Sequence, residues 1–230
     1  MSLPALDGPR VPARSGQTKQ LVVFLHGYGA DGNDLIDLGR QWAQLLPDAA
    51  FVSPHAHERC SMSPMGRQWF ALTFRDPGER WRGALSARPV IDAFLDAELA
   101  KHGLDDSALA LVGFSQGAMM ALHVGLRRKR APASIVAYSG ALIGAEHLAE
   151  ATARGRDGAL PRILMIHGDQ DEVVPLDSLF DGAEALAKAD LPVEFHLSLG
   201  TGHGIDSGGL THGALFAAAG FGLRPPQRRR

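Results

Sequence analysis

The sequence predicts an α/β fold, with a mostly parallel central sheet flanked by helices on both faces. Short apolar runs rich in β-branched residues recur along the chain, and amphipathic stretches lie between them. The runs show little polar alternation, which is typical of strands that are covered on both faces. Strands that alternate with helices indicate βαβ units, and these require parallel strands joined by right-handed crossovers.

The predicted elements follow one another along a single domain, 1–230, without an internal repeat or a linker. Apolar runs predict strands at 20–27, 49–56, 108–115, 134–140, 162–168 and 193–199. Apolar residues three and four apart predict helices at 33–46, 86–103, 115–130, 176–190 and 212–223, the last weakened by its glycines. Residues 1–18 are rich in Pro and Gly, and we expect them to form an irregular lead or a weak edge strand. We expect RPPQRRR at 224–230 to form a solvated basic tail.

Composition narrows the location and the partners of the protein. The formal net charge of −2 provides no field that would gather nucleic acid. Cys60 is the single cysteine, so no intramolecular disulfide can form. The N-terminus lacks the pattern of a signal peptide, and no apolar run reaches the roughly 18 residues of an integral membrane segment. We therefore expect a cytoplasmic protein without nucleic-acid partners, and the sequence leaves a homodimer open.

The pentapeptide Gly113-Phe114-Ser115-Gln116-Gly117 has the pattern G-x-S-x-G. The pattern is weak alone in a chain with 27 glycines, and the alternative is a strand-to-helix turn with a capping serine. Its context is a predicted strand before the serine and a predicted helix after it, as in a nucleophile elbow. Free N–H groups at the helix start would face a developing oxyanion. Ser115 is therefore the candidate nucleophile.

A serine nucleophile needs a base and an orienting acid. After a nucleophile elbow these follow in the order Ser, Asp or Glu, His. The segment RILMIHGDQDEVVP offers Asp169 and Asp171 after a later strand, and LSLGTGHGIDSGG places His203 on a loop after the last strand. The loop LHGYGADGND (25–34) would supply a second oxyanion donor, although any glycine-rich turn looks similar.

Together, LHGYGADGND, SPHAH, RQWF, GFSQGAMMAL, HGDQDEVVP and GTGHGI resemble the phospholipase/carboxylesterase family of α/β-hydrolases, which includes acyl-protein thioesterases. The resemblance runs from about residue 20 to about residue 220 and implies the α/β-hydrolase fold. It implies Ser115 as nucleophile, Asp171 rather than Asp169 as the acid, and His203 as general base. The backbone N–H groups of Tyr28 and Gln116 would form the oxyanion hole.

The resemblance implies a serine carboxylesterase acting on small to medium acyl esters, without cofactor or metal. RQWF followed by Ala71 looks like the bacterial esterase branch. An acyl-protein or other thioesterase, or a lysophospholipase with the same triad, is the alternative, and a non-catalytic binding protein is a remote one. The pair His55 and His57 resembles two metal ligands, but no cysteine or carboxylate cluster completes a site.

Two further expectations concern the substrate pocket. Residues 141–161 are too few for a large lid domain, so we expect an open pocket. The acyl group would contact Met65, Trp69 and Phe70, in a loop that also carries Met62 and Phe74. Ordinary packing of that loop against the core is the competing interpretation.

Overall fold

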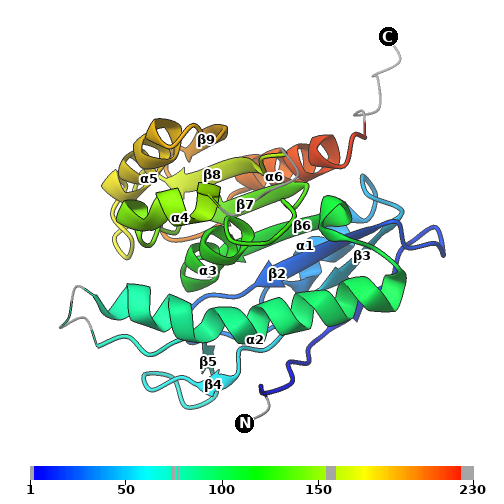
Figure 1. Cartoon of the computed structure of the whole chain (residues 1–230), viewed down its shortest axis with the longest axis horizontal. Coiled ribbons are helices and arrows are strands. Elements are labelled where there is room, and N and C mark those ends of the chain that lie inside the picture. The colour runs from blue at the N-terminus through cyan, green and yellow to red at the C-terminus, as the bar shows by residue number, and fades with distance from the viewer. Residues whose placement is uncertain (1–2, 74–75, 77, 154–158, 224–230) are drawn as a thin grey trace.

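A seven-stranded sheet forms the centre of the molecule (Figure 1). The structure, a computed structural model, describes residues 3–73, 76, 78–153 and 159–223, so the predicted basic tail lies outside it. In spatial order the strands are β1 (Arg10–Val11), β3 (Ala49–Val52), β2 (Gln20–Leu25), β6 (Leu109–Phe114), β7 (Ser134–Tyr138), β8 (Arg162–Gly168) and β9 (Val193–Ser198). Only β1, which pairs antiparallel with β3, departs from parallel pairing in this sheet. The predicted mostly parallel sheet is confirmed.

Helices cover both faces of the sheet, as predicted. They are α1 (Ile36–Trp42), α2 (Glu79–His102), α3 (Gln116–Gly125), α4 (Leu148–Ala153), α5 (Asp177–Lys188) and α6 (Ser207–Gly220), with short 3₁₀ turns η1 (Asp106–Ala108) and η2 (Ala145–His147). Apolar residues of α2, α3 and α5 pack in the core on one face, and those of α1 and α6 pack on the other. A small hairpin, β4 (Glu58–Arg59) with β5 (Arg67–Gln68), lies outside the main sheet.

Strand β2 shows why the central strands are apolar throughout. Leu21, Val23 and Leu25 belong to the core beneath α2, α3 and α5, whereas Val22 and Phe24 belong to the core beneath α1 and α6. Successive side chains of a strand point to opposite faces, so a strand buried on both faces has no polar position.

Two predicted helix starts are wrong. Helix α2 begins at Glu79, seven residues before the predicted start, and contains Pro89. The exposed Pro89 removes one helical hydrogen bond, but Ala84, Ala87 and Ile91 pack in the core on either side of it and hold the helix together. Helix α6 begins at Ser207 rather than at 212, because the Asp206 carboxylate accepts hydrogen bonds from the N–H groups of Gly208 and Gly209.

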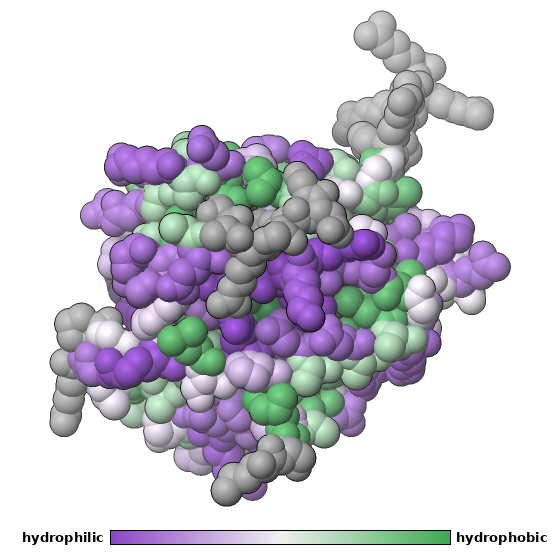
Figure 2. Space-filling model, viewed as in Figure 1, coloured by the Kyte–Doolittle hydropathy of each residue, from purple (hydrophilic) through white to green (hydrophobic). Residues whose placement is uncertain are grey.

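The connection from β7 to β8 contains only η2 and α4 in its described part, so no large lid covers the sheet. Within the described residues, none of the helices combines the length and apolarity that crossing a bilayer requires. The face shown in Figure 2 carries scattered hydrophobic areas among hydrophilic ones.

Candidate active site

Ser115 lies at the sharp turn between β6 and α3. Its backbone has φ 53° and ψ −117°, a conformation that L residues rarely adopt and that stores strain. The residues two positions before and after it must be glycines, because a Cβ at Gly113 would overlap the carbonyl of Gly117 and a Cβ at Gly117 would overlap that of Leu25. The turn is fixed by the Ser115 N–H, which donates to the Tyr138 carbonyl at 2.9 Å. The Ser115 side chain thus projects from the carboxyl edge of the sheet at the start of α3.

Asp171 and His203 form a hydrogen-bonded pair at the same edge of the sheet. Asp171 follows β8 and His203 follows β9, and His203 Nδ1 lies 2.7 Å from Asp171 Oδ2. The second carboxylate oxygen of Asp171 accepts the N–H groups of Val173 and Val174, each at 2.9 Å. A carboxylate only accepts hydrogen bonds, so His203 carries a proton on Nδ1 in this pair, and its Nε2 takes no part in the pair.

The environment keeps Asp171 ionised. Burial acts to raise the pKa of this carboxyl, but the hydrogen bonds from His203 and from the N–H groups of Val174 and Val173 outweigh burial and lower the pKa. A carboxylate that stays charged holds the imidazole in one tautomer and stabilises it when protonated.

A second histidine, which the sequence patterns did not single out, lies behind Asp171. His167 is buried on β8, and its Nε2 lies 2.9 Å from the Val174 carbonyl and 3.3 Å from Asp171 Oδ2. Both of these oxygens are acceptors, so Nε2 carries the proton and faces both. His167 is the first residue of the segment HGDQDEVVP, but the sequence patterns assign it no role, since a histidine at the end of an apolar strand looks like an ordinary core residue.

Asp169, the other aspartate of this loop, has a different environment. Its Oδ1 accepts the N–H groups of Gly200 at 2.7 Å and of Thr201 at 3.3 Å. The side chain therefore ties the loop after β8 to the loop that carries His203, and it braces the site without contacting the imidazole.

Ser115 and His203 line one cavity of about 250 Å³. The imidazole of His203 lies against the ring of Phe114, the residue before Ser115, with 4.8 Å between centroids. Among the hydrogen bonds of residues 3–73, 76, 78–153 and 159–223, none joins His203 to Ser115. The other lining residues are Gly27, Tyr28, Ala30, Asp34, Leu72, Arg80, Met119, Val173 and Val174.

Two backbone N–H groups beside Ser115 are free to donate. Tyr28 lies in the loop after β2 and lines the cavity, and its N–H makes no hydrogen bond within the described part of the chain. Gln116 is the first residue of α3, where a helix has no internal acceptor for its N–H. The site therefore combines Ser115, His203 and Tyr28, which line one largely apolar cavity, with the N–H of Gln116, the residue that follows Ser115 in the chain.

The structure does not bring the three predicted acyl-contacting residues to this cavity. Trp69 and Phe70 are buried in the core that α2 and α3 cover, and they are absent from the cavity wall. Met65 is 92% exposed and lines a neighbouring open hollow that shares Ala30 and Asp34 with the cavity. Met62 is also exposed, and Phe74 lies outside the described residues.

Apolar walls are instead supplied by Leu72, Phe114, Met119 and Val174. Across the described part of the chain, no group of three or more His, Cys, Asp or Glu side chains could hold a metal ion.

The sequence and the fold are similar to those of proteins named as esterases. The model of the family described as Phospholipase/Carboxylesterase matches residues 6–216. Esterase YpfH of Escherichia coli (strain K12) is 29% identical over 202 residues, which cover 88% of this chain and 81% of that protein. The crystal structure of esterase PE8 superposes with a TM-score of 0.88 and 41% identity, covering 94% of this chain and 99% of that one.

More distant structures share the fold. Acyl-protein thioesterase 2 of Zea mays superposes with a TM-score of 0.68 at 21% identity, covering 93% of this chain and 99% of that one.

Proposed function

The chain belongs to the phospholipase/carboxylesterase family of α/β-hydrolases, a family of serine hydrolases, and on this premise we propose a specific reaction for it. The reaction is the hydrolysis of small to medium acyl esters through an acyl-enzyme on Ser115. One observation carries the proposal: Ser115 and His203 line a single cavity, and Asp171 is hydrogen-bonded to the far side of His203.

In the first step Ser115 Oγ attacks the ester carbonyl while His203 Nε2 takes its proton. This requires the two atoms to come within hydrogen-bonding reach when substrate binds, and such contacts often tighten only then. Asp171 remains ionised and stabilises the imidazolium that forms. The N–H groups of Tyr28 and Gln116 donate to the oxyanion of the tetrahedral intermediate.

Collapse of that intermediate releases the alcohol, which receives the proton from His203 and leaves an acyl group on Ser115. A water molecule, deprotonated by His203, then attacks the acyl carbonyl. The second tetrahedral intermediate breaks the bond to Ser115 Oγ, and His203 returns the proton to the serine. The products are a carboxylic acid and an alcohol, and every proton is accounted for without a further group.

The size and lining of the cavity favour short to medium acyl groups. Its volume of about 250 Å³ is below the roughly 300–1,000 Å³ of pockets that bury drug-sized ligands. The wall formed by Leu72, Met119 and Val174 suits an alkyl chain, and Asp34 and Arg80 bring charge to the same cavity.

The proposal is tested with a fluorophosphonate probe and a chromogenic ester on the parent, Ser115→Ala and Asp171→Asn. We expect no labelling of Ser115→Ala, and a fall in kcat of about 10⁴-fold for each variant. Asp169→Asn is the matched control, since an amide oxygen can still accept the Gly200 N–H, and its kcat should fall less than about tenfold.

Two results would contradict the proposal: Ser115→Ala labelled as strongly as the parent, or Asp171→Asn no more impaired than Asp169→Asn. A matched ester and thioester with the same acyl group, compared on the parent, then separate an esterase from a thioesterase.

A further inference from the structure

Both proposed oxyanion donors are attached to one buried hydrogen-bond network. The network joins the side chain of Gln116, the backbone and indole of Trp69, the carbonyl of Phe70 and the backbone and ring of His26. We call it the Gln116–Trp69 network. It links the start of α3 to the loop after β2, two segments that are far apart in the sequence.

The Gln116 end of the network is fixed in orientation. The side chain is buried, its Oε1 accepts the Trp69 N–H at 2.9 Å, and its Nε2 donates to the Phe70 carbonyl at 2.8 Å. A flipped amide would put donor against donor and acceptor against acceptor, so only one orientation satisfies both bonds. The residue whose backbone N–H is the second proposed oxyanion donor thereby holds residues 69–70 with its side chain.

The Trp69 end reaches the loop that carries Tyr28. The fully buried indole donates from Nε1 to the His26 carbonyl at 2.9 Å. The His26 ring lies 2.8 Å from the Gly27 carbonyl through Nδ1, and its Nε2 accepts the Ala56 N–H at 3.0 Å. Burial lowers the pKa of His26 to about 4, so the ring is neutral and keeps one donor and one acceptor at neutral pH.

The hairpin strand before Trp69 holds the other side of the same loop. The Gly29 N–H donates to the Arg67 carbonyl at 2.9 Å, and the Arg67 N–H donates to the Ala30 carbonyl at 2.7 Å. Tyr28 therefore lies between His26, whose carbonyl is held by Trp69, and the pair Gly29 and Ala30, which is held by Arg67.

We infer that Gln116, through its side chain, and Trp69, through its indole N–H, are positioning residues that fix the Tyr28 N–H relative to the Gln116 N–H. The inference rests on the proposed function, because it assigns both N–H groups to the oxyanion. Donors stabilise an oxyanion only when they are held at the place where its charge develops. If the loop could shift by a fraction of an ångström, its interaction with the transition state would weaken more than its interaction with the bound substrate.

Trp69→Phe tests the inference, since it removes the indole N–H and keeps an aromatic ring in the core. Trp42→Phe is the matched control: Trp42 is also buried, but its Nε1 has no hydrogen-bond partner in the described part of the chain. We expect Trp69→Phe to lower kcat about tenfold with KM within about twofold, and Trp42→Phe to change neither by more than about twofold.

Three readouts separate positioning from a general loss of structure. Fluorophosphonate titration counts the active sites, so kcat refers to folded enzyme only. The affinity of an alkylboronic acid, which forms a tetrahedral adduct with a nucleophilic serine, should fall in parallel with kcat in Trp69→Phe. Gln116→Met removes both side-chain hydrogen bonds at similar volume and should show the same split between kcat and KM; it replaces Trp69→Phe if that variant does not fold.

The outcomes distinguish the two proposals. If Ser115→Ala keeps the parent rate, the proposed function fails and the positioning role fails with it. If Ser115→Ala is inactive but Trp69→Phe and Gln116→Met behave as Trp42→Phe does, only the positioning role is overturned. A rise in KM at constant kcat would also overturn it, because it would place the residues in substrate binding.

Discussion

His123 is a buried histidine on α3 whose two ring nitrogens have no hydrogen-bond partner in the described part of the chain. Its ring and that of Trp81 form a T-shaped pair, with 5.3 Å between centroids. Burial, followed by the positive charges of Arg127 and Arg88, lowers the pKa of His123 to about 3. The ring is therefore neutral in the folded protein at any pH above that value.

This residue should make the protein sensitive to acid. Below pH 6.5 the unfolded chain takes up a proton on His123, whereas the folded chain takes it up only near pH 3, so falling pH favours unfolding across that window. Through this group, the free energy of unfolding is about 2 kcal/mol lower at pH 5 than at pH 7. His123→Leu should remove this difference, which urea unfolding at pH 7 and pH 5 would measure. An equal pH 7 to pH 5 difference in parent and variant would contradict the prediction.

Candidate site residues differ in how far the sequence reveals them. Ser115 sits in a pattern that sterics impose, because its glycine neighbours are required by close backbone approach. The network role of the Gln116 side chain has no such pattern, since its partners Trp69 and Phe70 lie 47 and 46 residues away. Aromatic residues near a motif suggested an acyl groove, but the same apolar surface also suits the core, and sequence alone does not separate the two.

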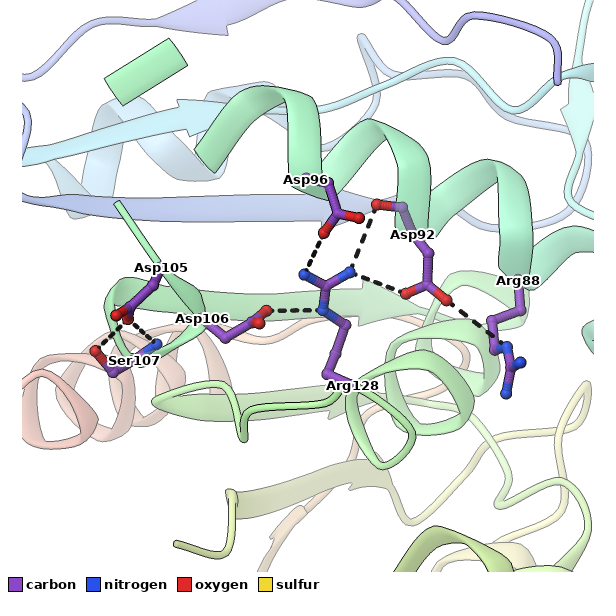
Figure 3. A network of polar contacts seen from close by, with 7 residues as sticks. All are labelled: Arg88, Asp92, Asp96, Asp105, Asp106, Ser107 and Arg128. Carbon is purple, nitrogen blue, oxygen red and sulfur yellow. Dashed lines mark hydrogen bonds and ion pairs between the residues drawn. The ribbon is translucent and has the colours of Figure 1, made fainter. Parts of the chain in front are cut away.

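Helix α2 is joined to the segment that follows α3 by a buried guanidinium, as Figure 3 shows. Arg128 donates to Asp106 at 2.7 Å, to Asp96 at 2.6 Å and to Asp92 at 3.1 Å. Burial acts to lower the pKa of Arg128, but the hydrogen bonds to Asp106 and Asp96 outweigh it and raise the pKa. One cation thus holds carboxylates from two turns of α2 and from η1, just before β6.

Removing this cation should destabilise the fold. Arg128→Met keeps most of the apolar stem but leaves Asp106 buried without its partner, and we expect the free energy of unfolding to fall by about 3 kcal/mol. Arg130→Ala is the control, since Arg130 forms an exposed pair with Asp105, and it should cost less than about 1 kcal/mol. Urea unfolding measures both. Equal losses of unfolding free energy in the two variants would contradict the prediction, because the buried network would then stabilise the fold no more than an exposed ion pair does.

At the scale of elements, the sequence predicts strands better than helix ends. Each predicted strand is present, because a short apolar run between polar turns is typical of a buried strand. Helix ends depend on individual contacts: Asp206 caps α6 before the apolar pattern begins, and α2 starts ahead of its predicted first residue, where Ala84 packs in the core. The hairpin of β4 and β5 was not predicted, since strands of two residues leave no periodicity to detect.

The whole molecule places its candidate site at the carboxyl edge of the parallel strands. The loops after β2, β6, β8 and β9 carry Tyr28, Ser115, Asp171 and His203, and all of these strands run in the same direction. Ligands of open α/β sheets bind at this edge. The order of the strands could not be deduced from the sequence, because it depends on which face each crossover helix covers.

The lack of a large lid in the described part of the chain has a kinetic consequence. No bulky segment among the described residues must move aside at a lipid surface, so the rate should saturate smoothly with ester concentration and show no step where the ester forms micelles. Nitrophenyl esters from acetate to dodecanoate measure this, and kcat/KM should decline for the long chains that exceed the cavity. A sharp rise in rate at the critical micelle concentration, or a preference for dodecanoate, would contradict the prediction.

The double use of Gln116 has a practical consequence for protein engineering. Its side-chain amide, in the first turn of α3, forms hydrogen bonds with residues 69 and 70. The hairpin region and the turn that carries Ser115 should therefore be replaced together when a segment is taken from a relative. A designer who transplants the hairpin from a relative to alter selectivity must import a compatible residue at position 116 as well. Chimeras that cross over between these two segments should be the poorest catalysts of any recombination series.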